Sequence, residues 1–251
     1  MLVPMSFWGT ILDRAAKLAL DGPVGALLGA VRRSRGASAS ADRTDAQELT
    51  RQVAFTIGTI VLGAKLAKAD GVVSRHEVTA FRQVFHVPPE EMRNVAWLYD
   101  RAKRDSTGFE PYARQIAKLL RGHPAVLEEL LDGLFHIARA DGEINRAELA
   151  YLGAVAGIFG FGEEEFRRIR AGNGAADADD PHAVLGLAPA ATMDEVKAAH
   201  RRLVREYHPD RLVAEGVPPE CVRIANDKLA AINDAYDRIR RARTMVHAEA
   251  P

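Results

Sequence analysis

Residues 192–210 read TMDEVKAAHRRLVREYHPD and predict one amphipathic helix that ends in a sharp turn. Thr192 and Glu195 have the spacing of a capping box, in which each side chain bonds the other residue's backbone N–H at a helix start. An apolar stripe at helical spacing is flanked by basic side chains; the stripe is Val196, Ala199, Leu203 and Tyr207, and the basic residues are Lys197, Arg201, Arg202 and Arg205. Pro209 restricts the residue before it to extended backbone, so we expect the helix to end at Tyr207 or His208.

The sequence on either side of His208-Pro209-Asp210 predicts a helical hairpin. Residues 180–187, DPHAVLGL, indicate a short helix upstream. Residues 228–236, KLAAINDAY, indicate a longer helix downstream, with an apolar face toward the first: Leu229, Ile232, Tyr236 and Ile239. The three motif residues therefore lie in the turn between two long helices, where the Asp210 carboxylate is available to a partner arginine.

Residues 180–244 as a whole resemble a J-domain, the module with which co-chaperones stimulate ATP hydrolysis by a DnaK-type chaperone. The resemblance implies a DnaK-binding face made of His208, Pro209, Asp210, Lys197, Arg201, Arg202 and Arg205. The sequence departs from the family at His182 and His200, which stand where aromatic residues are usual. Both are packing positions, so the departures bear on stability or affinity rather than on identity.

His208 and Asp210 also have the chemistry of a general base and its orienting carboxylate, as in a hydrolase. Such a site needs a nucleophile, and the nearest candidates are Cys221 and Thr192. Neither belongs to a recognisable nucleophile elbow. We therefore predict that the protein is not an enzyme.

An internal repeat organises the middle of the chain: residues 67–77, AKADGVVSRHE, match residues 138–148, ARADGEINRAE. In each copy an apolar helix ends at Asp-Gly, where Gly71 or Gly142 adopts a positive φ. Ser74 or Asn145 then caps the next helix, with Glu77 or Glu148 at its third position. The pattern predicts an all-α bundle with pseudo-twofold character.

The repeated turn matches the second half of a calcium-binding EF-hand loop but not the first half. The positions that must donate carboxylates are Leu66 and Lys68 in one copy and Ile137 and Arg139 in the other. Two interpretations stay open for the acidic residues Asp70, Glu77, Asp141 and Glu148. They cap helices, or they converge from the two halves into one divalent-metal site. No other cofactor is expected.

Residues 46–170 resemble a TerB-type (tellurite-resistance) helical domain, a family whose members carry this doubled turn and are in some cases associated with metal and stress responses. The expected organisation is an N-terminal apolar or amphipathic segment at 1–33, a linker at 34–45, the TerB-like domain at 46–170, a linker at 171–179, the J-domain at 180–244 and a tail at 245–251. This order resembles the DjlA family of bacterial co-chaperones.

Two functions follow from that resemblance. In the first, the TerB-like domain selects an unfolded or specific client, a location or a stress signal, and the J-domain delivers it to the chaperone. In the second, the TerB-like domain is a divalent-metal sensor and the J-domain is its output.

Composition and charge bear on localisation. The 34 basic and 34 acidic residues cancel, so no overall field favours nucleic acid, and we expect no nucleic-acid partner. A single cysteine, Cys221, fits a reducing compartment. Four charges, at Asp13, Arg14, Lys17 and Asp21, interrupt the N-terminal apolar segment and argue against a membrane span. We expect a cytoplasmic protein; the segment either docks on its own domain or lies on the inner membrane surface as an amphipathic helix.

Overall fold

The fold follows from helices that begin and end at local sequence signals. A computed structural model describes residues 43–69, 92–104, 108–174, 180–217 and 222–248. These residues form helices, turns and loops, with no strand among them. The predicted all-α fold class is confirmed.

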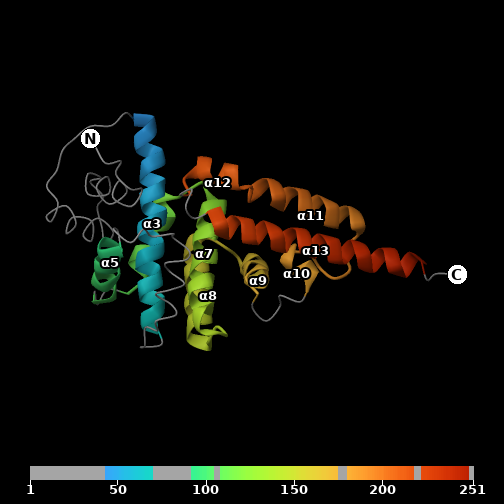
Figure 1. Cartoon of the computed structure of the whole chain (residues 1–251), viewed down its shortest axis with the longest axis horizontal. Helices are drawn as coiled ribbons and strands as arrows, with labels where there is room; N and C mark the ends of the chain where they lie inside the picture. The colour runs from blue at the N-terminus through green and yellow to red at the C-terminus, as the bar shows by residue number, and fades with distance from the viewer. Residues whose placement is uncertain (1–42, 70–91, 105–107, 175–179, 218–221, 249–251) are drawn as a thin grey trace.

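The first group of helices forms what we call the helical bundle. It consists of α3 (Arg43–Ala69), α5 (Met92–Arg104), α6 (Glu110–Leu119), α7 (Pro124–Ala138), the 3-10 turn η1 (Arg139–Asp141), α8 (Arg146–Phe159) and α9 (Glu163–Gly172). The remaining helices form the hairpin domain: α10 (Pro181–Val184), α11 (Met193–Glu206), α12 (Pro209–Glu215) and α13 (Val222–Ala248). Figure 1 shows α11 and α13 side by side, projecting away from the bundle.

α7 is the central helix of the molecule. It contacts α3, α8 and α9 within the bundle and α12 and α13 of the hairpin domain. One face of α7 is apolar and buried: Leu127, Leu130, Leu131, Leu134, Phe135 and Ala138. The opposite face is also buried, including the carboxylates of Glu128, Glu129 and Asp132. Helices therefore cover α7 on all sides, which an amphipathic pattern does not predict.

The second copy of the repeated turn has the predicted geometry. Gly142 has a φ of 124°, and Asn145 caps α8 by accepting hydrogen bonds from the N–H groups of Ala147 and Glu148. Glu148 completes the capping box by accepting from the Asn145 N–H at 2.8 Å. In the first copy α3 runs to Ala69, and the turn at residues 70–77 lies outside the described residues. The pseudo-twofold pairing of the two turns stays a prediction.

The helices extend beyond the segment boundaries expected from composition. α3 begins at Arg43, inside the predicted linker at 34–45, and α13 continues to Ala248, inside the predicted tail at 245–251. α9 runs through Gly172 into the predicted linker at 171–179, and Ala171 there is buried. Small residues that indicate a linker by composition are helical here because the bundle packs against them. The N-terminal segment at 1–33 lies outside the described residues.

A membrane span needs a long, strongly apolar helix. Within the described ranges, none of the helices combines the length and the apolarity that crossing a membrane requires.

Candidate functional site

α11 carries most of the residues predicted to bind a partner, and its sequence explains its limits. Thr192 caps it by accepting from the Glu195 N–H, and Glu195 accepts in turn from the Thr192 N–H at 2.6 Å. The predicted stripe of Val196, Ala199, Leu203 and Tyr207 is buried. α11 ends at Glu206 with Tyr207 as its C-cap, as the following His208-Pro209 predicts.

His208, Pro209 and Asp210 begin a helix rather than forming an open loop. His208 is the N-cap of α12: its Nδ1 accepts a hydrogen bond from the Asp210 N–H at 3.2 Å, and Pro209 occupies the first turn. Pro is favoured there because it lacks the N–H that a first turn leaves unbonded. The Asp210 carboxylate lies 3.7 Å from His208 Nδ1, and the side chains of His208 and Asp210 are 52% and 93% exposed. The structure thus presents both side chains to a partner.

A basic surface continues from this turn along α11. The predicted cations Lys197, Arg201, Arg202 and Arg205 are all exposed. Three of them line a shallow groove of about 380 Å³ together with Ala198, Glu206 and Arg211. Arg211, on α12, was not among the predicted residues; its guanidinium donates to Glu215 at 2.7 Å. The sequence signal that could have identified Arg211 as part of this surface is its position directly after the His208-Pro209-Asp210 motif.

The two unusual histidines have different surroundings. His200 stacks on Tyr236 with ring centroids 4.3 Å apart, and its Nε2 lies 2.8 Å from Asn233 Oδ1. His200 thus joins α11 to α13 as an aromatic residue would. The backbone N–H of His182 donates to the N-cap carboxylate of Asp180 at 2.9 Å, while the ring Nε2 of His182 is buried with no hydrogen-bond partner among the described residues.

The four acidic residues of the predicted metal site are only partly described. Asp70 and Glu77 lie outside the described residues, and Asp141 ends η1. Glu148 is buried and caps α8, as the first of the two interpretations predicts. The described ranges contain no group of three or more His, Cys, Asp or Glu residues arranged to hold a metal ion. A metal site shared by both turns stays a prediction.

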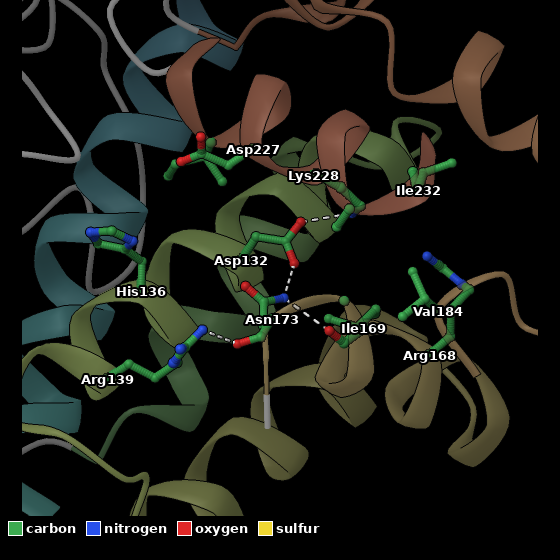
Figure 2. Close-up of a pocket in the computed structure, with 13 residues that line it drawn as sticks. Asp132, His136, Arg139, Arg168, Ile169, Asn173, Val184, Asp227, Lys228 and Ile232 are labelled. Carbon is green, nitrogen blue, oxygen red and sulfur yellow. Dashed lines mark hydrogen bonds and ion pairs between the residues drawn. The ribbon is translucent and has the colours of Figure 1, made fainter. Parts of the chain in front are cut away.

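A buried ionic cluster joins the bundle to the hairpin domain. Its centre is Glu128 on α7, whose carboxylate accepts hydrogen bonds from Arg168 at 2.8 and 2.5 Å, from the Tyr207 hydroxyl at 2.5 Å and from the Lys228 ammonium. Asp132, one turn further along α7, accepts from Lys228 at 2.7 Å and from the Asn173 side chain at 2.5 Å. Figure 2 shows Asp132 between Lys228 and Asn173. We refer to Glu128, Asp132, Arg168, Tyr207 and Lys228 as the interdomain cluster.

Charge pairing sets the protonation of this cluster. Burial alone would raise the pKa of Glu128, but Lys228 and Arg168 outweigh it and lower the pKa to about 2. Burial would lower the pKa of Lys228, yet Asp132 and Glu128 raise it above its ordinary value. Burial raises the pKa of Asp132, and the Lys228 ammonium opposes that rise. Two anions facing two cations leave the cluster neutral, which is the condition under which buried charges are tolerated.

Glu129 has the opposite environment from its neighbour Glu128. It is fully buried, and neither of its carboxyl oxygens has a hydrogen-bond partner among the described residues. Burial, with a further contribution from Asp132, raises the pKa of Glu129 well above its ordinary value. Burial therefore favours the protonated form of Glu129, because an unpaired buried carboxylate is strongly disfavoured.

A cavity of about 170 Å³ lies beside the cluster, between α7, α9 and α13. Asp132, His136 and Arg139 line one side, and Asp227 and Lys228 the other (Figure 2). Arg139 donates to the backbone carbonyl of Asn173. Burial and the nearby Arg223 lower the pKa of His136, so its imidazole is neutral at pH 7.

Local pattern does not reveal the interdomain cluster. The one available signal was in α7, where Glu128, Glu129 and Asp132 interrupt an otherwise apolar helix. Tyr207 and Lys228 have the pattern of ordinary helix residues of the hairpin, and their partners on α7 lie about 80 to 100 residues away in the chain.

Comparisons with known proteins match both parts of the molecule. A family model described as tellurite resistance protein TerB matches residues 56–171, and a DnaJ domain model matches residues 180–244. Curated relatives named co-chaperone protein DjlA cover most of the chain. The protein from Coxiella burnetii is 28% identical over 96% of this chain and 100% of its own length, and that from Shewanella oneidensis is 29% identical over 84% and 86%. The protein from Photobacterium profundum is 30% identical over 80% of this chain and 81% of its own length. No solved structure matches significantly.

Proposed function

Because the chain belongs to the DjlA family of co-chaperones and carries a C-terminal J-domain, we propose that it docks on a DnaK-type chaperone and accelerates ATP hydrolysis there. The J-domain is the hairpin domain described above. The proposed binding face consists of the exposed His208–Asp210 turn and the basic groove of α11 and α12.

The observation that carries this proposal is the arrangement of that face. His208 and Asp210 are exposed, and Arg211, the residue directly after them, lines a groove together with Arg201, Arg202 and Arg205. Clustered guanidinium groups attract an acidic surface and raise the association rate, whereas a fixed turn supplies the specific contact. Co-chaperone action needs no chemistry on this chain, which fits a regulator rather than an enzyme.

The bundle supplies the second part of the proposed function. We propose that it selects the client or the cellular location that the J-domain serves. The co-chaperone names of the relatives support a chaperone-linked role for the chain as a whole. The predicted membrane contact of residues 1–33 stays a prediction.

The test is single-turnover ATP hydrolysis by the DnaK-type chaperone of the same organism, with the wild type and with His208→Gln. We expect the wild type to increase the hydrolysis rate and His208→Gln to lose at least nine-tenths of that increase, roughly the effect of removing one central contact of an interface. Arg241→Ala, which removes an exposed cation from α13, is the control and should retain stimulation. Equal stimulation by the wild type and His208→Gln would contradict the proposal.

A further inference from the structure

The segment that contains His208–Asp210 is attached to the bundle immediately before the motif. Tyr207, 2% exposed, donates its hydroxyl to Glu128 at 2.5 Å. Arg168 of α9 approaches the same hydroxyl at 3.3 Å, and the Lys228 ammonium lies 3.9 Å from the centre of the Tyr207 ring. The residue that precedes the motif is therefore bound to three helices other than its own.

The segment is attached to the bundle again immediately after the motif. α12 contacts α3 and α7, and its Leu212 is fully buried. Glu215 Oε2 lies 3.7 Å from His123 Nδ1 beside the start of α7. Gly216 has a φ of 112°, and a Cβ there would come within 2.5 Å of the Arg51 Cβ on α3. The backbone at this end approaches the bundle too closely for a larger residue.

These attachments hold the motif without covering it. His208 and Asp210 stay largely exposed, whereas the Glu128 side chain is 1% exposed. Glu128 thus cannot reach a chaperone docked on the exposed face. Its effect on such a partner has to be indirect, through the position and mobility of the motif.

We propose that Glu128 of the bundle is a positioning residue for the His208–Asp210 motif, which makes the bundle part of the chaperone-docking device. Glu128 accepts hydrogen bonds from Tyr207, Arg168 and Lys228 and so ties the end of α11, α9 and α13 to α7. A turn held in its bound geometry loses less conformational freedom when a partner docks. The inference rests on the proposed function and adds that the bundle raises the affinity of the J-domain for the chaperone.

The activity test uses the full chain with Glu128→Gln and, separately, Tyr207→Phe, which removes only the hydroxyl. We expect each variant to raise the co-chaperone concentration that gives half-maximal ATPase stimulation, on the order of threefold to tenfold, because loosening a preorganised segment weakens binding. The maximal stimulated rate should be unchanged, because neither residue reaches the docked partner. Asn145→Ala, which removes the N-cap of α8 within the bundle, is the control for general destabilisation.

A second measurement needs no chaperone. The Leu212 N–H donates to the His208 carbonyl across the motif, so its hydrogen-exchange rate reports how firmly the motif is held. We expect faster exchange at Leu212 in Glu128→Gln and in Tyr207→Phe, and no change at Val196 near the start of α11. Asn145→Ala should leave the Leu212 rate unaltered.

The outcomes separate the two proposals. If the wild type fails to stimulate hydrolysis, the proposed function fails, and hydrogen exchange alone decides whether Glu128 positions the motif. Unchanged exchange at Leu212 would overturn the inference. If the wild type does stimulate hydrolysis, three further results would overturn the inference. They are an unchanged half-maximal concentration in Glu128→Gln and Tyr207→Phe, stronger stimulation by these variants than by the wild type, and an equal effect of Asn145→Ala.

Discussion

Glu128 and Glu129 are adjacent in α7, and the fold shifts their pKa values in opposite directions. Glu128 faces the two cations Lys228 and Arg168, which lower its pKa to about 2 despite burial. Glu129 faces no partner among the described residues, so burial raises its pKa. The environment that the tertiary structure places around each carboxyl, and not the residue type, decides its charge.

Replacing Glu129 should stabilise the protein, and more so at high pH. A buried polar group without a partner destabilises by about 1–3 kcal/mol, and Glu129→Met removes both oxygens at similar volume. Because the folded protein keeps a proton that the unfolded chain releases above the ordinary pKa of 4.5, wild-type stability falls as pH rises above that value. Glu129→Met lacks this loss of stability. Its gain in the free energy of unfolding over the wild type, measured by urea denaturation, should therefore be larger at pH 8 than at pH 5.

The comparison variant is Glu128→Met, which removes the paired neighbour and leaves buried Lys228 and Arg168 short of a carboxylate. It should destabilise the protein by about 3–5 kcal/mol. A Glu129→Met protein that loses stability to the same degree, or whose gain is equal at both pH values, would contradict the protonated state of Glu129.

At the scale of one element, α11 is specified by signals at both of its ends. The Thr192–Glu195 capping box begins the helix, and the His208–Pro209 step ends it. The four apolar residues between them are buried, and the cations are exposed. Each signal is local, so the helix could be predicted within one or two residues.

Thr192→Ala should lower the free energy of unfolding by about 1 kcal/mol, because it leaves the first turn of α11 without its side-chain acceptor. Urea denaturation measures the change. Thr192→Ser keeps the hydroxyl and should stay close to the wild type. An equal loss in the serine and alanine variants would mean that the threonine methyl group, rather than the cap, accounts for the effect.

At the scale of the whole molecule, the bundle and the J-domain share one buried cluster. Tyr207 and Lys228 of the J-domain enter it from α11 and α13, and Glu128, Asp132 and Arg168 enter from the bundle. A buried ion pair is weak proof of net stability, since an apolar pair of similar volume often does as well. Removing one partner of a buried ion pair nevertheless lowers stability strongly, because it leaves a buried charge unpaired. The cluster therefore specifies how the bundle and the J-domain meet.

The stability difference between the wild type and Glu128→Gln should therefore depend on pH. The folded-state pKa of Glu128 is lowered from 4.5 to about 2, so its contribution is complete above pH 4.5 and is lost as pH falls toward 2. The difference in the free energy of unfolding between the two proteins should shrink by about 2 kcal/mol from pH 6 to pH 3. Thermal or urea unfolding of both proteins across this range measures it, and a constant difference would mean that Glu128 is not ionised in the cluster.

Local pattern was sufficient for much of this protein. Capping boxes, helical apolar spacing and the His208-Pro209-Asp210 motif depend on residues within a few positions of one another, and they predicted the all-α fold, α11 with its exposed cations and the turn at Gly142. Composition, by contrast, placed a segment boundary inside α9, because Gly and Ala near residue 171 indicate a linker when the packing of the chain is not known.

The interdomain cluster was decided by tertiary structure alone. Glu128, Arg168, Tyr207 and Lys228 are separated by up to 100 residues and have no shared periodicity. Whether a glutamate in an apolar helix faces water, a cation or nothing depends on which helices pack over it. That choice moved the pKa values of Glu128 and Glu129 in opposite directions and brought the bundle next to the motif. Buried charges pair strongly only once the fold has removed water from around them.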